Sequence, residues 1–241
     1  MTRLYINNIL EAKRELTLSP DHSHYLARVL RYQLDDIVNV FNENNGEWQS
    51  KVTQITKKSI VIQIEKQLRQ PSSTPPLWLA FAPLKNDAMG FLIEKATELG
   101  VTHLQPILTE RCNTQRLNLE RLQKNAIEAA QQCERLDVPM VLEAVGLQSW
   151  EKPESIEWYV ALERTDAEPI QKVLRQSKTS AWGFIIGPEG GFTSQEVTLF
   201  SKDKITPINL GLRILRAETA ALYVLAIAGS IKDAPTRFNP L

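Results

Sequence analysis

Short apolar segments alternate with helical segments over most of the chain, and this alternation restricts the possible fold more than any other feature. We expect strands at residues 77–82, 103–108, 158–162, 182–186 and 205–210. Helices are expected between and after them, at residues 86–99, 117–135, 169–176, 194–201 and 217–231. Strands that are joined through helices form parallel sheets with helices on both faces. Since about 165 residues are too few for an eight-fold barrel, the sequence predicts an open α/β sheet.

The first 70 residues follow the pattern of β-strands instead. Strands are expected at residues 36–41, 48–56 and 60–65, and an Asn-Gly turn lies between the first two, at residues 42–46. In the third strand Ile60, Ile62 and Ile64 occupy alternate positions, which is typical of a strand with one buried face.

One helix is expected in this front segment. Ser19 and Pro20 suit its N-cap and first position. We expect this helix to direct Leu26, Val29 and Leu30 inward and to carry Arg28 and Arg31 near its end. A small β-barrel with one helix is the simplest interpretation of residues 1–70.

A break in composition separates the two patterns. Residues 70–76 read QPSSTPP, and Ser and Pro without periodicity are typical of a linker. The sequence therefore predicts three parts: a front domain at residues 1–70, a linker at 71–76 and an α/β domain at 77–241.

Composition excludes several classes of protein. Lys and Arg number 28, as do Asp and Glu, so a strongly cationic surface for nucleic acid is not expected. Cys112 and Cys133 are the only cysteines, which excludes a disulfide framework and a four-thiolate zinc site within one chain. No stretch approaches the ~20 apolar residues of a membrane helix, and the first ten residues do not resemble a secretory signal. We therefore expect a cytoplasmic protein.

The sharpest motif is FIIGPEGGFTSQE at residues 184–196. It reads as a buried strand, a glycine turn and a helix that opens with a capping box from Thr193 to Glu196. In open α/β sheets, ligands bind at the carboxyl ends of the strands. The turn lacks the Lys-Ser/Thr ending of a phosphate-binding loop and the glycine spacing of a dinucleotide-binding loop. It predicts either a ligand-binding loop or a tight turn whose glycines serve the backbone alone.

A second motif, LGLRILRAETAA at residues 210–221, repeats this arrangement of strand, turn and helix. Arg213, Arg216 and Glu218 lie where the chain leaves the sheet. They indicate either a functional site or a solvated helix start, with Glu218 next to the positive end of the helix dipole.

The two motifs together resemble the RsmE family of bacterial methyltransferases, which act on N3 of a uridine in small-subunit ribosomal RNA. Further segments are similar to the same family: EKATELGV at 94–101, TERC at 109–112, AQQCER at 130–135, RLY at 3–5 and VLR at 29–31. The resemblance covers nearly the whole chain. Gly90 departs from it, because the family often has an acidic or polar residue there.

The resemblance implies a PUA-like β-barrel domain followed by a SPOUT-type domain, whose parallel sheet is knotted. It implies S-adenosyl-L-methionine as the cofactor, no metal and no membrane. The implied partners are ribosomal RNA or the small ribosomal subunit, and a second copy of the chain in a homodimer. The apolar helix at 217–231 is a suitable part of such an interface.

The chemistry of the implied reaction suggests candidate residues. A base or a cation beside the ring oxygens must make the uracil imide nucleophilic, and the candidates are Glu218 as the base and Arg216 or Arg111 as the cation. Cofactor-binding candidates lie in or beside the two motifs: Leu162, Gly187, Pro188, Glu189, Gly190, Gly191, Leu210, Gly211, Ile214, Leu215, Ala217 and Thr219. Arg3, Arg28 and Arg31 are the candidates for RNA phosphate contacts, since arginine forks suit phosphates.

Two other classes of protein remain open at this point. A catalytically silent RNA-binding protein would need Arg3, Arg28 and Arg31 but neither glycine motif. Another α/β enzyme could bind ATP or NAD at residues 187–191, although the absent loop lysine argues against ATP.

Overall fold

The computed structural model describes residues 2–112, 116–163 and 165–232 of the 241-residue chain. The chain divides into two compact units. One consists of Met1–Ser73 and Ala130–Val138, and the other of Thr74–Ala129 and Pro139–Leu241. The first division falls inside the predicted linker, whereas the assignment of residues 130–138 to the front unit has no counterpart in the sequence prediction.

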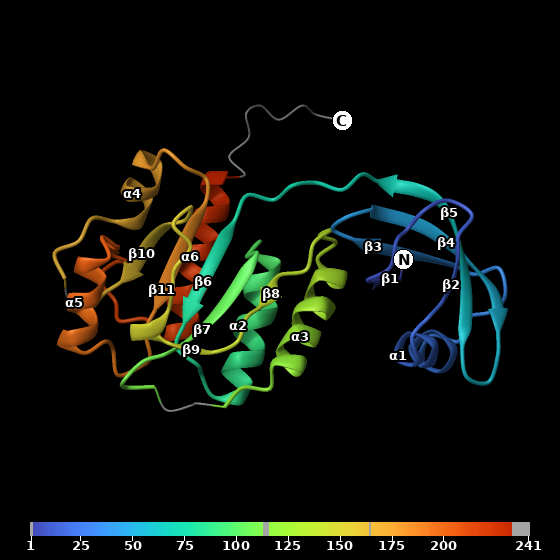
Figure 1. Ribbon diagram of the computed structural model, residues 1–241, viewed down its shortest axis with the longest axis horizontal. Coiled ribbons are helices and arrows are strands. Elements are labelled where there is room, and N and C mark those ends of the chain that lie inside the picture. The colour runs from blue at the N-terminus through green and yellow to red at the C-terminus, as the bar shows by residue number, and fades with distance from the viewer. Residues whose placement is uncertain (1, 113–115, 164, 233–241) are drawn as a thin grey trace. The chain divides into compact units, whose positions relative to one another are not determined.

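The front unit is built on a five-stranded sheet with strand order β1-β3-β4-β5-β2 (Figure 1). Its strands are β1 (Arg3–Tyr5), β2 (Glu15–Thr17), β3 (Ile37–Asn42), β4 (Gly46–Ile55) and β5 (Ile60–Arg69). β1 pairs with β3 in parallel, and the other pairs are antiparallel. β3, β4 and β5 are the strands that the sequence predicts. β1 and β2 were not predicted, because three-residue edge strands carry no periodic signal.

The isoleucines at alternate positions of β5 are buried, as the sequence predicts. Ile60, Ile62 and Ile64 are at most 1% exposed and belong to the core of this unit, together with Val38 and Val40 of β3. A one-residue shift in register would place all three isoleucines on the solvent face, so burial of this face fixes how β5 pairs.

The Asn-Gly turn between β3 and β4 is confirmed. The side-chain oxygen of Asn42 accepts hydrogen bonds from the backbone N–H groups of Asn44 (3.0 Å) and Asn45 (2.7 Å). Gly46 has a φ of +75°, and a Cβ at this position would lie 2.2 Å from the carbonyl oxygen of Arg69. Glycine is required here by both conformation and space.

The helix of the front unit begins as predicted but ends differently. Ser19 caps α1 (Pro20–His24) by accepting a hydrogen bond from His22 N–H. The chain then widens into the π-helix η1 (Tyr25–Val29), in which Leu30 N–H donates to the carbonyl of Tyr25. Leu26 is fully buried, but Val29 is 60% exposed and Leu30 37% exposed. The prediction that both point inward was wrong, because a wider turn changes which residues face the core.

The second unit contains a mostly buried sheet in the order β12-β10-β11-β6-β7-β8, and β9 also pairs with β7. All its pairs are parallel, which confirms the prediction. The strands are β6 (Leu77–Phe81), β7 (His103–Leu108), β8 (Met140–Val141), β9 (Val145–Gly146), β10 (Glu157–Ala161), β11 (Trp182–Ile186) and β12 (Thr206–Ile208).

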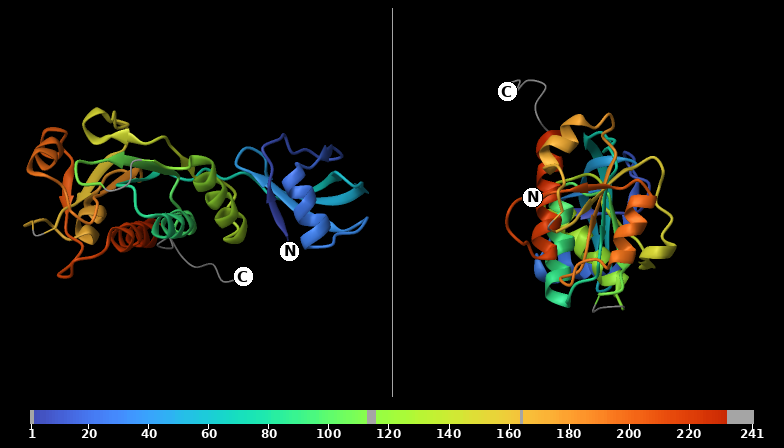
Figure 2. Two further views of the ribbon diagram at one scale, coloured as in Figure 1. Left: turned by 90° about the horizontal axis from the view of Figure 1, so that it is seen from below. Right: turned by 90° about the vertical axis from the view of Figure 1, so that its left-hand side faces the viewer.

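Helices connect these strands and cover both faces of the sheet (Figure 2). They are α2 (Asn86–Glu98), α3 (Leu119–Gln132), α4 (Ile170–Gln176), α5 (Ser194–Lys202) and α6 (Ala217–Lys232), with the 3₁₀ turn η2 (Leu147–Ser149). α6 packs against α2, α4 and β11, whereas Phe200 of α5 packs on the opposite face with Ile185 and Trp158. The predicted helices are confirmed, although α3 is shorter at both ends than the predicted 117–135.

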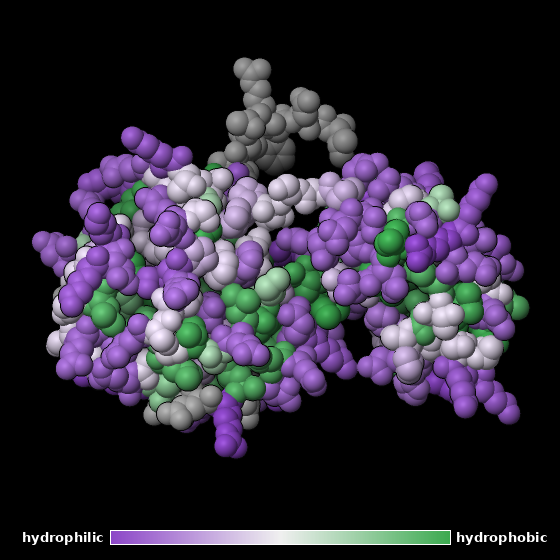
Figure 3. All heavy atoms as spheres, viewed as in Figure 1, coloured by the Kyte–Doolittle hydropathy of each residue, from purple (hydrophilic) through white to green (hydrophobic). Residues whose placement is uncertain are grey.

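The face of each unit that Figure 3 shows is mainly hydrophilic, with small hydrophobic areas between the hydrophilic residues. No helix within the described ranges is long and apolar enough to cross a membrane.

Candidate functional site

Several loops of the second unit meet at one edge of its sheet. Since the strands are parallel, their carboxyl ends lie along the same edge, which is where open α/β sheets bind ligands. Residues 187–192 follow β11 there, and residues 209–216 follow β12. β10 pairs with both of these strands, so half-buried Leu162, just after β10, lies between the two loops. The fold therefore brings the two predicted cofactor motifs to one place.

The glycines of the loop after β11 are required for different reasons. A Cβ at Gly187 would lie 2.8 Å from the ring of Phe192. Gly191 has a φ of +66°, and its N–H donates to the carbonyl of Pro188 in a tight turn (2.9 Å). Pro188 is buried, whereas Glu189 and Gly190 are exposed. The loop therefore exposes part of its backbone at the carboxyl edge of the sheet.

Arg111 contacts this loop from a different strand. It follows β7, and its Nη1 donates a hydrogen bond to the carbonyl oxygen of Gly190 at 2.7 Å. Its side chain is exposed, and no carboxylate pairs with it in the part of the chain that the structure describes. The guanidinium keeps most of its five N–H donors for another partner. The structure therefore brings Arg111 and Gly190 together.

Glu196 is a residue of this site that the sequence prediction did not include. It is 1% exposed. One carboxylate oxygen accepts from Thr193 N–H (2.8 Å) and the other from Glu110 N–H (2.9 Å). The bond to Thr193 completes the predicted capping box. The bond to Glu110 spans 86 positions in the chain, and no local pattern indicates it.

The loop after β12 exposes apolar side chains. Gly211 has a φ of +110°, and its N–H donates to the side-chain oxygen of Asn209 at 2.7 Å. Leu212 is fully exposed and Ile214 is 65% exposed, whereas Leu210 and Leu215 are half-buried. Exposed apolar side chains of this kind often mark a surface that an apolar part of a ligand or partner covers.

The predicted catalytic residues Arg216 and Glu218 lie at the start of α6. The carbonyl of Arg216 accepts from Ala220 N–H at 2.8 Å, as the residue before a helix does. Arg216 is exposed and Glu218 half-buried in the first turn. Within the described ranges Glu218 forms no ion pair with Arg216 or Arg111. Ala217 is buried, and Thr219 is exposed on the first turn.

The three arginines predicted to bind RNA differ in their surroundings. Arg28 and Arg31 are exposed at the end of η1, and Arg31 has a φ of +57°. Both guanidinium groups are open to a phosphate.

Arg3, in contrast, is 8% exposed and belongs to the core of the front unit. Its Nε donates to Glu47 at 2.8 Å, and its terminal nitrogens donate to the carbonyls of Ala130 (3.3 Å), Gln131 (3.1 Å) and Arg135 (3.1 Å). These four hydrogen bonds use four of the five N–H donors of the guanidinium group, so at most one donor remains for a phosphate. Burial and these contacts favour a structural role for Arg3, and its contact with a phosphate stays a prediction.

Glu47 joins two arginines in this core. It accepts from Arg3 and, at 2.6 Å, from Nε of Arg69. Burial alone would raise the pKa of the Glu47 carboxyl, but the hydrogen bonds and charges of Arg3 and Arg69 outweigh burial and lower it. The carboxylate therefore stays ionised at neutral pH.

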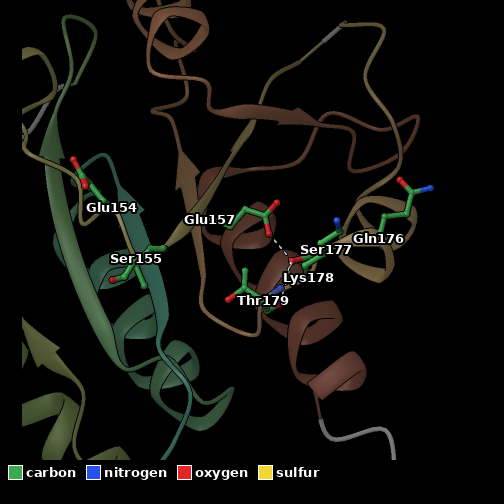
Figure 4. A pocket seen from close by; sticks show the side chains of 8 residues that line it. Glu154, Ser155, Glu157, Gln176, Ser177, Lys178 and Thr179 are labelled. Atoms are coloured by element: carbon green, nitrogen blue, oxygen red, sulfur yellow. Dashed lines mark hydrogen bonds between the residues drawn. The ribbon is translucent and has the colours of Figure 1, made fainter.

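An open depression of about 580 Å³ lies at the other edge of the sheet of the second unit (Figure 4). Glu157, the first residue of β10, and Ser177, after α4, line it, and the Ser177 hydroxyl donates to the Glu157 carboxylate. Because it lies at the amino end of β10, it is separate from the loops at the carboxyl edge.

Comparisons with known families match both units. Residues 70–229 match the family described as "RNA methyltransferase domain", and residues 18–65 match "RNA methyltransferase PUA domain". These matches define the class of protein: an RNA methyltransferase domain preceded by a PUA domain.

Comparison with individual relatives identifies the family within this class. The chain is 36% identical to ribosomal RNA small subunit methyltransferase E of Rickettsia conorii, over 93% of each chain. It is 35% identical to the protein of the same name from Synechocystis, over 90% of this chain and 73% of the relative. The chain belongs to the family of ribosomal RNA small subunit methyltransferase E.

Solved structures agree in fold. The ribosomal RNA small subunit methyltransferase E of Neisseria gonorrhoeae, bound to S-adenosyl methionine, has a TM-score of 0.83 and 28% identity, with 96% of this chain and 97% of that chain covered. A methyltransferase of Legionella pneumophila with bound S-adenosyl methionine has a TM-score of 0.83 and 27% identity, with 95% and 97% covered.

Proposed function

We propose that this chain transfers a methyl group from S-adenosyl-L-methionine to N3 of a uridine in the 16S ribosomal RNA of the small subunit. The observation that carries the proposal is the carboxyl edge of the second unit, where two glycine loops and Arg111 converge on one place. Family membership supports the reaction class, and the two solved relatives with bound S-adenosyl methionine support the cofactor.

The residues at this edge fit such a cofactor. A Cβ at Gly191 or Gly211 would meet nothing within 4 Å, so the space beside both backbones is open. Exposed Leu212 and Ile214 offer apolar contacts to adenine. The Thr109 hydroxyl, after β7, is buried without a hydrogen-bond partner among the described residues, which leaves one donor or acceptor for a ligand or water.

Residues of both loops and of the start of α6 would hold the cofactor. The proposed set is Leu162, Gly187, Pro188, Glu189, Gly190, Gly191, Leu210, Gly211, Ile214, Leu215, Ala217 and Thr219. When bound, S-adenosyl-L-methionine supplies a methyl group that is already activated by its sulfonium.

The protein must then make the uracil nitrogen nucleophilic. A neutral imide N–H is a poor nucleophile, so N3 has to lose its proton. The carboxylate of Glu218 accepts that proton, and the guanidinium of Arg216 or Arg111 stabilises the negative charge on the ring oxygens. Holding both reactants in line supplies much of the remaining rate enhancement.

The front unit binds the RNA. Arg28 and Arg31 present exposed guanidinium groups at one end of η1, where forked donors suit phosphate oxygens. Such contacts fix the position of the RNA without reading its sequence.

A homodimer is part of the proposal. α6 leaves Thr219, Tyr223, Ala226 and Ser230 exposed at helical spacing, and Tyr223 is 38% exposed. This stripe of three small residues and one tyrosine runs along α6 and suits a second copy of the chain. Because ribosomal RNA is the substrate, we place the enzyme in the cytoplasm.

Calorimetric titrations with S-adenosyl-L-methionine, ATP and NAD test the cofactor assignment. We expect saturable binding of S-adenosyl-L-methionine and none of the other two. Saturable binding of ATP or NAD would favour another nucleotide-binding enzyme, and the absence of all three signals would favour a protein that only binds RNA.

A further inference from the structure

We propose that Glu196 is a positioning residue that holds the turn carrying Arg111 against the glycine loop and thereby keeps the cofactor site formed before the ligand arrives. This inference rests on the proposed function, because it concerns the same site.

Burial of Glu196 requires an explanation. The residue is 1% exposed, and no cation pairs with its carboxylate within the described residues. A buried charge without a counter-ion is costly unless hydrogen bonds and dipoles compensate for it. Here both oxygens accept from backbone N–H groups, and the carboxylate lies in the first turn of α5, at the positive end of that helix.

The two backbone partners of Glu196 belong to the two segments that form the site. Thr193 N–H ends the glycine loop at the start of α5, and Glu110 N–H belongs to the turn after β7. A capping box needs only the first of these contacts. The second contact has no role in capping, so its effect is to tie the turn at 109–112 to the loop at 187–192.

Arg111 is the next residue after Glu110 and makes a second contact between these segments. Its Nη1 donates to the carbonyl of Gly190, and a Cβ at Gly190 would lie 3.4 Å from Cβ of Arg111. The arginine thus packs closely along the glycine loop. Fixing the Glu110 backbone limits the positions that the Arg111 side chain can take, which lowers the entropy lost when a ligand orders the site.

The variant Glu196→Gln tests this role. Its amide oxygen can replace only one of the two carboxylate oxygens, and its NH₂ group then faces the N–H donor that the other oxygen had accepted from. We expect the dissociation constant for S-adenosyl-L-methionine, measured by calorimetry, to rise about tenfold. Hydrogen exchange at the Glu110 amide should become faster, which reports the contact without any turnover.

Thr193→Ala is the matched control. It removes the hydroxyl that accepts from Glu196 N–H at 3.3 Å but leaves both carboxylate contacts. We expect it to lower the melting temperature, because α5 loses its N-cap, with cofactor affinity within about twofold of wild type. A similar loss of affinity in both variants would overturn the proposal in favour of a general loss of helix stability.

Arg111→Ala completes a double-mutant cycle. If Glu196 acts through the Arg111 turn, the double variant should lose less affinity than the two single losses combined.

A folded Glu196→Gln protein with wild-type affinity would contradict the proposal. Hydrogen exchange at the Glu110 amide of the wild-type protein gives a second test, which does not depend on the folding of any variant. Exchange as fast as that of amides in exposed loops would also contradict the proposal. Failure of the wild-type protein to bind S-adenosyl-L-methionine would instead contradict the proposed function, while protection of the Glu110 amide would still report its bond to Glu196.

Discussion

Arg111 Nη1 lies 2.7 Å from the carbonyl oxygen of Gly190, although the two residues are 79 positions apart in the chain. The contact joins the turn after β7 to the loop after β11. It places a cation with no carboxylate partner in the described structure beside a backbone that is open to a ligand. The proposed methyl transfer depends on this arrangement, and the predictions below test its parts.

Gly190→Val should weaken cofactor binding without unfolding the protein. The new Cβ would lie 3.4 Å from Arg111 Cβ, and the added methyl groups would displace the guanidinium or crowd the ligand. We expect the affinity for S-adenosyl-L-methionine to fall by roughly tenfold or more, as overpacking of this kind implies. Calorimetry measures the affinity, and a melting curve checks the fold. Unchanged affinity in a folded variant would remove the loop from the cofactor site.

Gly90→Ala is the matched control for a glycine substitution. Gly90 lies in α2, and the nearest atom to an added Cβ is the side-chain amide nitrogen of Asn125 at 3.4 Å. Because glycine is a poor helix residue, the substitution should raise the free energy of unfolding by about 0.5–1 kcal/mol and leave cofactor affinity unchanged. Loss of affinity here would show that glycine substitutions act through the fold in general.

The structure of the proposed cofactor loops could be predicted from the sequence because their pattern is local. A strand, a glycine turn and a capped helix are adjacent in the chain, so FIIGPEGGFTSQE is sufficient to predict the structure of residues 184–196. The contacts of Glu196 with Glu110 and of Arg111 with Gly190 join distant segments. Periodicity does not encode such pairs, and without a set of related sequences no signal could reveal them.

Arg3 shows a second limit of sequence reasoning. An arginine near the N-terminus of an RNA-binding domain suggests a phosphate contact, because arginine is normally exposed. Here Glu47 and the carbonyl groups at the end of α3 bury it. The prediction that Val29 and Leu30 point inward was wrong. The π-helix changes which residues face the core, and no local sequence motif indicates a π-helix here.

Arg3→Ala should therefore destabilise the protein rather than weaken its affinity for RNA. Removing one partner from a buried ion pair costs about 3 kcal/mol or more, since the remaining charge loses its compensation. Urea unfolding measures this loss. A stable Arg3→Ala variant whose RNA affinity falls strongly would instead support Arg3 as a phosphate ligand.

Acid should remove part of this stabilisation. The folded protein holds the pKa of Glu47 below its ordinary value of 4.5. A lowered pKa stabilises the fold at pH values above 4.5, and this contribution disappears as the pH falls through the folded-state pKa. The stability difference between wild type and Glu47→Gln should therefore be large at pH 7 and shrink below about pH 4.5. A difference that stays constant from pH 7 to pH 3 would contradict this origin.

RNA binding should depend on Arg28 and Arg31. The double variant Arg28→Ala, Arg31→Asn removes both charges and retains a residue that tolerates the positive φ at position 31. The slope of log K against log salt should become shallower by about 0.7–0.9 for each phosphate that the protein no longer neutralises. Lys57→Ala with Lys58→Ala removes the same charge from the exposed turn between β4 and β5. An equal change in slope for both pairs would indicate that net charge, and not these arginines, governs binding.

Glu218→Gln separates catalysis from helix capping. A general base lost in this way should reduce the single-turnover methylation rate by about 10²–10⁴. If Glu218 serves only the helix dipole, the variant should lose about 0.3–1 kcal/mol of stability with its rate nearly intact. In that case a large rate loss in Arg216→Ala would indicate that the arginine lowers the pKa of the imide and lets water take the proton.

Mapping of the product tests the central claim most directly. The wild-type protein is incubated with isotope-labelled S-adenosyl-L-methionine and either free 16S ribosomal RNA or small subunits that lack the modification. The RNA is then digested and its nucleosides are analysed by mass spectrometry. We predict labelled 3-methyluridine as the product, strongly reduced in Gly190→Val and retained in Gly90→Ala. Label in another nucleoside, or no label in either RNA substrate despite saturable cofactor binding, would contradict the account.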